Sequence, residues 1–125
     1  MESFGEFVFA EPYRGIPVEA VNDVLLPEDY LAFMHEHNGG EGDVGGTYLV
    51  LFPLEELQTV NDNYEVTKVL PDSVIIGCDG GGELYGVDEQ GRYFNVPAIM
   101  DKEDVSYLGN RFDEFFEKVK SFWEE

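Results

Sequence analysis

Apolar residues recur at helical spacing in two segments of the chain. In the first segment, Pro27 suits an opening helical turn, and Asn38 and Gly39 form a stop signal because glycine there readily adopts the left-handed conformation. Glu28 and Asp29 follow Pro27, where the helix dipole favours negative charge. The apolar face of this predicted helix consists of Tyr30, Leu31, Phe33 and Met34.

The second helical segment runs from about residue 110 to residue 124. Its large apolar side chains follow the i, i+3, i+4, i+7 spacing of an amphipathic helix. They are Phe112, Phe115, Phe116, Val119, Phe122 and Trp123. Burying this face would contribute on the order of 2 kcal/mol for each large side chain.

Runs rich in β-branched and aromatic residues predict strands at 74–76, 84–87 and 92–96. Gly80, Gly81 and Gly82 separate the first two, and a turn containing Gly91 favours a hairpin between the last two. The continuous apolar run at 47–52 predicts a strand that is buried on both faces. Residues 6–10 predict a short edge strand.

The remaining segments have weaker patterns. Residues 17–25 and 54–60 fit short helices, and the second of these would end at residues 61–63. We expect a flexible acidic loop at 41–46, a loop or extended segment at 64–70 and irregular structure at 101–109. Because helices and strands do not alternate regularly, the sequence predicts an α+β fold with a single, mostly antiparallel sheet and flanking helices. The length of 125 residues fits one domain over residues 1–125.

Charge narrows the classes of partner. The chain has 27 acidic and 7 basic residues and a formal net charge of −20. Nucleic acid and anionic membrane surfaces would be repelled, so we expect neither as a partner. The acidic surplus favours a basic protein partner or simply high solubility, and charge alone does not choose between them.

The beginning of the chain and its cysteine content bear on location. The first residues lack the basic and long apolar regions of a signal peptide, and no apolar run approaches a membrane span. A single cysteine, Cys78, permits no intramolecular disulfide. We therefore expect a cytoplasmic protein.

The residues that could carry chemistry do not form a known site. The three glycines at 80–82 are followed by Glu83 and a strand, whereas a phosphate loop needs a lysine, a hydroxyl and a helix. His35 and His37 point in different directions on a helix, so they would not share a metal. Cys78 follows a hydrophobic run and fits a small buried hydrophobe better than a nucleophile. The sequence predicts no enzymatic activity, no metal and no cofactor.

Several short motifs together resemble the SUKH (Smi/Knr-type) superfamily. They are Leu26-Pro27-Glu28-Asp29-Tyr30, Asn38-Gly39-Gly40, Leu54-Glu55-Glu56-Leu57 with Asn61, Ile76-Gly77-Cys78-Asp79-Gly80-Gly81-Gly82-Glu83, and Tyr107-Leu108-Gly109. The resemblance covers roughly residues 17–119 and departs at Cys78, where serine or asparagine is commoner.

This resemblance implies an α+β fold without catalysis. It also implies an immunity protein that binds and neutralises a cognate bacterial polymorphic toxin, often a nuclease. The alternative is a regulatory scaffold similar to the eukaryotic regulator of cell-wall assembly. A basic toxin domain would be attracted by the acidic chain. The contact residues that we predict lie in its acidic loops: Glu41, Asp43, Asp79 and Glu83.

Overall fold

The computed structural model describes residues 8–9, 18–22, 24–44, 47–79, 82–98, 102–115 and 117. Its helices are α1 (Glu28–Glu36), α2 (Leu57–Tyr64) and α3 (Val66–Val69), with 3-10 helices η2 (Leu54–Glu56) and η3 (Lys102–Asp104). Its strands are β1 (Val8–Phe9), β2 (Ala20–Val21), β3 (Val24–Leu25), β4 (Gly40–Val44), β5 (Thr47–Leu51), β6 (Ser73–Cys78), β7 (Glu83–Asp88), β8 (Tyr93–Pro97) and β9 (Ser106–Gly109).

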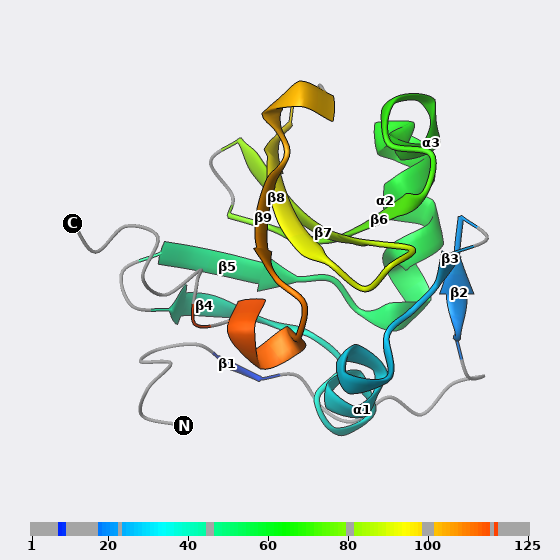
Figure 1. The fold of residues 1–125 in the computed structure, drawn as a ribbon. Helices are drawn as coiled ribbons and strands as arrows, with labels where there is room; N and C mark the ends of the chain where they lie inside the picture. The colour runs from blue at the N-terminus through cyan, green and yellow to red at the C-terminus, as the bar shows by residue number, and fades with distance from the viewer. Residues whose placement is uncertain are drawn as a thin grey trace.

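One sheet organises the described part of the molecule. Its strand order is β1-β4-β5-β6-β7-β8-β9, and every neighbouring pair is antiparallel. The sheet is strongly twisted, so β5 and β8 run in clearly different directions in Figure 1. The α+β fold with a mostly antiparallel sheet is therefore confirmed. The predicted hairpin is confirmed too, since β7 pairs with β8 from Glu83↔Pro97 to Val87↔Tyr93.

The sheet carries apolar side chains on both faces, and two clusters of buried residues result. The larger cluster joins Tyr30 and Met34 of α1, Leu49 and Leu51 of β5, and Phe112 and Phe115. The smaller cluster joins Val66 and Leu70 to Ile75, Leu84, Phe94 and Val96. Each cluster combines residues that lie far apart in the chain, so packing of the helical segments fixes both faces of the sheet.

The helix predicted at 27–38 is confirmed as α1. Tyr30 and Met34 are fully buried, and Leu31 and Phe33 are half-buried against the larger cluster. Residues 112–115 are helical, and their apolar members Phe112 and Phe115 are buried as predicted. The rest of the predicted 110–124 helix lies outside the described residues, except for residues 110, 111 and 117.

Two segments at the start of the chain differ from prediction. Residues 17–25 were expected to form a helix, but β2 and β3 form a two-stranded hairpin. Asn22 turns this hairpin with a positive φ of 57°, and its amide binds Asn61 and the backbone of Ser73. Residues 41–44 were expected to form a loop, but they belong to β4, which pairs with β5. Residues 45 and 46 lie outside the described part.

Three other predictions were wrong in detail. The strand at 47–52 is buried on one face only, since Leu49 is fully buried whereas Tyr48 is 43% exposed. The helix that was expected to end at residues 61–63 continues to Tyr64, where Glu65 ends it with a positive φ of 54°. Residues 64–70 were expected to form a loop or an extended segment and residues 101–109 to be irregular, but they contain α3, η3 and β9.

Candidate partner-binding surface

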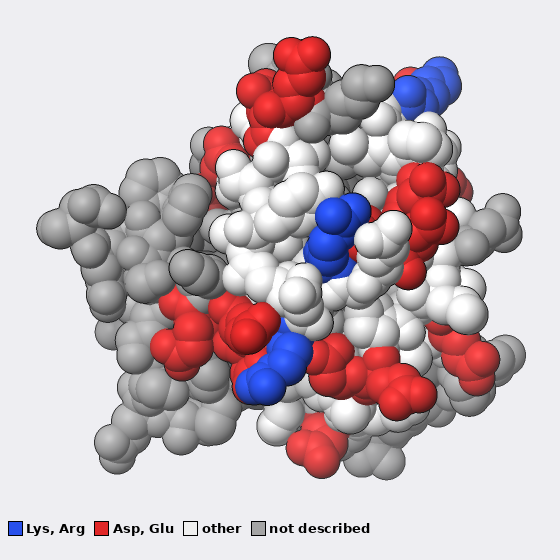
Figure 2. All heavy atoms as spheres, viewed as in Figure 1, with Lys and Arg blue, Asp and Glu red and all other residues white. Residues whose placement is uncertain are grey.

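Basic side chains do little to balance the acidic surface. Among the residues whose side chains are described, the basic ones are Lys68, Arg92 and Arg111. They pair with Glu65 at 3.0 Å, Asp88 at 2.8 Å and Asp113 at 2.5 Å, respectively. Figure 2 shows acidic groups in several separate patches with few basic groups among them. A partner that binds this surface must therefore supply its own positive charge.

The predicted contact residues Glu41 and Asp43 both lie on β4. The carboxylate of Glu41 is exposed and accepts a hydrogen bond of 2.5 Å from the hydroxyl of Tyr48 on β5. Asp43 stands opposite Tyr48 in the strand register, and its side chain is outside what the structure describes. Glu41 is thus presented from a strand whose backbone is held by β5, rather than from a flexible loop.

The other predicted contact residues, Asp79 and Glu83, close the turn between β6 and β7. The Asp79 carboxylate accepts a hydrogen bond from the backbone N–H of Glu83 at 3.0 Å, and the Asp79 N–H donates to the Glu83 carbonyl at 3.1 Å. The Glu83 carboxylate accepts a bond of 2.5 Å from the side-chain amide of Asn95 on β8. Both residues are half-buried, and their carboxylates already stabilise the turn and its contact with β8.

The sheet brings the two acidic segments to one region. Glu41 stands opposite Val50, and Val50 stands opposite Cys78, which immediately precedes Asp79. Two strand spacings, about 10 Å in all, therefore separate the backbone of Glu41 from that of Cys78. The sequence alone did not predict that these two acidic segments lie close together, because their proximity depends on the pairing of β5 with both β4 and β6.

Asn38 and Gly39, which belong to one of the motifs that carried the family resemblance, have structural roles. Asn38 accepts a bond from the N–H of Leu54 at 2.8 Å, which ties the end of α1 to the start of η2. Gly39 has a φ of +95°, and a Cβ there would lie 2.4 Å from the carbonyl oxygen of Leu51. These positions therefore require their residue types for structural reasons.

Cys78 and the two histidines lie on different elements, since Cys78 is on β6, His35 is on α1 and His37 caps the end of α1. Cys78 is half-buried and packs against the smaller apolar cluster, which agrees with a small hydrophobe. His35 is exposed on α1, and the ring of His37 lies 5.7 Å from that of Phe33. Within the described residues, no group of three or more His, Cys, Asp or Glu is arranged to hold a metal ion.

Three buried tyrosines are electrostatically unusual. Burial raises the pKa of Tyr30, Tyr85 and Tyr93 above the ordinary value of 10.0. The nearby carboxylates of Asp79 and Glu83 raise the pKa of Tyr85 further, since they oppose a phenolate charge. Within the described part of the chain, the hydroxyls of Tyr30 and Tyr85 are buried without a hydrogen-bond partner.

We expect these tyrosines to make the fold sensitive to alkali. Above about pH 10, unfolded tyrosines release protons while the buried ones keep theirs, so the stability present below that pH declines as pH rises. Urea unfolding measured at a series of pH values from about 8 to 11 tests this. Tyr30→Phe removes one of the three groups and should give a shallower decline; identical slopes for the two proteins would contradict the assignment.

Comparison with known proteins bears on the fold and its motifs. The sequence model of the SMI1 / KNR4 family (SUKH-1) matches residues 17–118. No curated protein matches the chain. None of the helices described here is long and apolar enough to cross a membrane. The family match spans α1, the strands β4 to β9 of the central sheet and the helical residues 112–115, whereas β1 lies outside it.

Proposed function

Because the chain belongs to the SMI1/KNR4 family (SUKH-1), whose members are typically immunity proteins of polymorphic toxin systems, we propose that it binds and neutralises a cognate bacterial toxin. Neutralisation would work by occlusion and would need no catalysis. The toxin we propose is a basic domain, such as a nuclease whose surface is built to attract nucleic acid.

This proposal is supported by the family membership of the chain together with its negative net charge. The chain has a formal net charge of −20. Each of the three basic side chains that the structure describes forms an ion pair with a neighbouring carboxylate. Such a surface attracts a basic protein over a distance of about one Debye length, roughly 10 Å at 0.1 M salt. Charge complementarity of this kind mainly raises the association rate and the specificity.

The predicted contacts Glu41, Asp43, Asp79 and Glu83 are consistent with this function to different degrees. Glu41 is exposed, its backbone is fixed by β5, and its carboxylate accepts a hydrogen bond from the exposed Tyr48 at Oε2, so a cation can approach it without rearrangement of the strand. Asp79 and Glu83 already bind the turn and Asn95, so a partner would have to share these acceptors. We therefore propose Glu41 as the strongest of the four contacts.

Growth rescue tests the proposal. The product of the gene immediately upstream, where we expect the cognate toxin to be encoded, is expressed in a bacterial host, with and without the chain. We expect growth to be arrested by the toxin alone and restored by co-expression. An Asn61→Ala variant, which should fold poorly, provides a control for the need for a folded domain. Persistent growth arrest with abundant folded protein would contradict the proposed function.

A further inference from the structure

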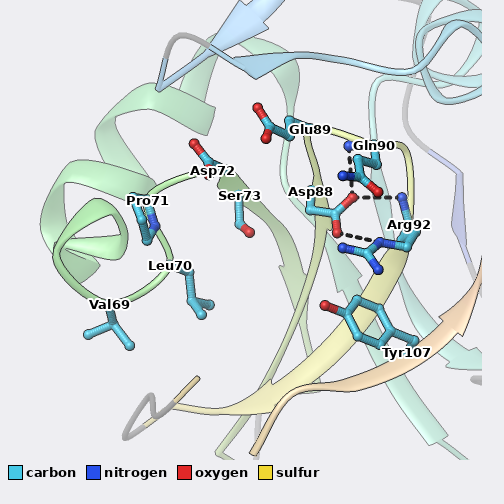
Figure 3. Close-up of a pocket in the computed structure, with 10 residues that line it drawn as sticks. All are labelled: Val69, Leu70, Pro71, Asp72, Ser73, Asp88, Glu89, Gln90, Arg92 and Tyr107. Carbon is cyan, nitrogen blue, oxygen red and sulfur yellow. Dashed lines mark hydrogen bonds and ion pairs between the residues drawn. The ribbon is translucent and has the colours of Figure 1, made fainter. Parts of the chain in front are cut away.

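A hollow of about 300 Å³ lies on the sheet away from the four predicted contacts. It is bounded by the corner between α3 and β6 and by the turn between β7 and β8 (Figure 3). Tyr107 of β9 closes its lower side in that view. The residues that line the hollow lie up to 38 positions apart in the chain, from Val69 to Tyr107. No local sequence pattern predicts the hollow.

The two walls of the hollow differ in chemistry. Val69, Leu70 and Pro71 form an apolar wall at the corner after α3. On the opposite wall, the guanidinium of Arg92 lies 4.6 Å from the centre of the Tyr107 ring. Tyr107 is 55% exposed, although large aromatic side chains are more often buried, and exposed tyrosines are enriched at protein interfaces.

Arg92 does not make the hollow positive, because the carboxylate of Asp88 balances its charge. Its Nε donates to the Asp88 carboxylate at 2.8 Å, and its backbone N–H donates to the same carboxylate at 2.9 Å. The N–H of Gln90 adds a third bond to Asp88 at 3.0 Å. This network fixes the turn between β7 and β8 and holds the guanidinium against the Tyr107 ring.

Two further carboxylates stand at the rim. The N–H of Glu89 donates to the carbonyl of Asp72 at 2.9 Å, so the backbone holds these two acidic residues next to each other. Both residues are exposed, and no described Lys or Arg side chain pairs with either. The lining therefore holds three carboxylates, those of Asp72, Asp88 and Glu89, against the single guanidinium of Arg92.

We propose that this hollow receives a lysine or arginine side chain of the protein partner. The apolar wall suits the methylene stem of such a side chain, and the rim carboxylates of Asp72 and Glu89 suit its charged head. An anionic group would meet a net negative lining. A bare metal ion fits poorly, because the three carboxylates of the lining are not arranged to hold one, and the described residues contain no group of three or more His, Cys, Asp or Glu that is. This inference rests on the proposed function, since it names where the basic partner is held.

The test compares two variants that change the total charge equally. Asp72→Asn with Glu89→Gln removes the rim charges and leaves the backbone bond between the two residues in place. Glu36→Gln with Glu56→Gln removes two exposed carboxylates that do not line the hollow, on α1 and η2. Each variant has a formal net charge of −18, two less negative than the −20 of the natural chain. Affinity for the product of the gene immediately upstream, the expected toxin, is measured by isothermal titration, together with the melting temperature.

We expect the rim variant to bind about tenfold more weakly or worse, which is about 1.4 kcal/mol. The control variant should lose less than about threefold, and both should melt no lower than the natural chain because they lose only exposed like charges. Equal affinity of the rim variant and the natural chain, or equal losses in both variants, would overturn the hollow as the binding site. Absence of binding by the natural chain itself would instead overturn the proposed function.

Discussion

Replacing Asn61 by alanine is expected to lower the free energy of unfolding by about 3 kcal/mol. Asn61 is 1% exposed, and its amide N–H₂ donates to the carbonyls of Leu57 at 2.8 Å and Ile75 at 2.9 Å. Its carbonyl oxygen accepts from the N–H of Ile75 at 2.8 Å and from the amide of Asn22 at 3.2 Å. Alanine would remove all four bonds at once.

The position of Asn61 explains why the loss should be so large. Strand β5 pairs with β6 at Gly77 and Cys78, and the N–H of Phe52 then binds the carbonyl of Ile76. At Ile75 no strand follows on that side, and the Asn61 side chain takes the place of a neighbouring backbone. Without it, a buried N–H and a buried carbonyl of the central strand would have no partner.

Chemical unfolding in urea measures this effect. Asn63→Ala is the matched control, because Asn63 lies on the same helix and is exposed. We expect that control to change the free energy of unfolding by no more than about 0.5 kcal/mol. Similar stabilities for the Asn61→Ala and Asn63→Ala variants would show that the side chain does not support the edge of β6.

Replacing Asp29 by alanine is expected to cost about 2 kcal/mol of unfolding free energy. Its carboxylate joins three elements. One oxygen accepts from the N–H of Tyr30 at 2.7 Å and from the hydroxyl of Tyr93 at 3.0 Å, and the other accepts from the N–H of Phe112 at 2.7 Å. We expect less than for Asn61 because Asp29 itself is exposed, and water can replace part of what is lost.

The comparison with Glu28 isolates this bridging role. Glu28 is also exposed and lies in the same first turn of α1, so Glu28→Ala removes a charge near the helix N-terminus without removing the three bonds. Thermal melting of both variants should show a clearly lower melting temperature for Asp29→Ala. Equal melting temperatures would mean that the helix dipole accounts for the effect and that the bonds to Tyr93 and Phe112 contribute little.

The strongest periodic patterns in the sequence correctly predicted α1 and the hairpin of β7 and β8. Strand β4 was missed because Gly40-Glu41-Gly42-Asp43-Val44 has no apolar alternation, and its strand form depends on pairing with β5. The hairpin of β2 and β3 was mistaken for a helix because Val18, Val21, Val24 and Leu25 also fit helical spacing. The hairpin depends on the turn at Asn22, whose positive φ is fixed by contacts with residues 36 to 51 positions away.

The acidic character of the surface could be predicted from composition, but its geometry could not. Composition does not reveal that Asp79 and Glu83 are engaged in a turn, since the bond to Asn95 requires the pairing of β7 with β8. It also does not reveal that Asp72 and Glu89 are neighbours, because they are 17 residues apart and meet through a backbone bond. Both arrangements depend on strand register, which short-range patterns do not specify.

Calorimetric titration tests most directly whether the chain binds a basic toxin domain. The purified chain is titrated with the product of the gene immediately upstream, the expected toxin, at about 0.05 M and about 0.5 M salt. We predict a saturable complex with a dissociation constant below the micromolar range, and a clearly weaker one at the higher salt concentration because the attraction between charges is screened. No binding at micromolar concentrations, or an affinity that salt leaves unchanged, would contradict charge-assisted binding of a toxin by this chain.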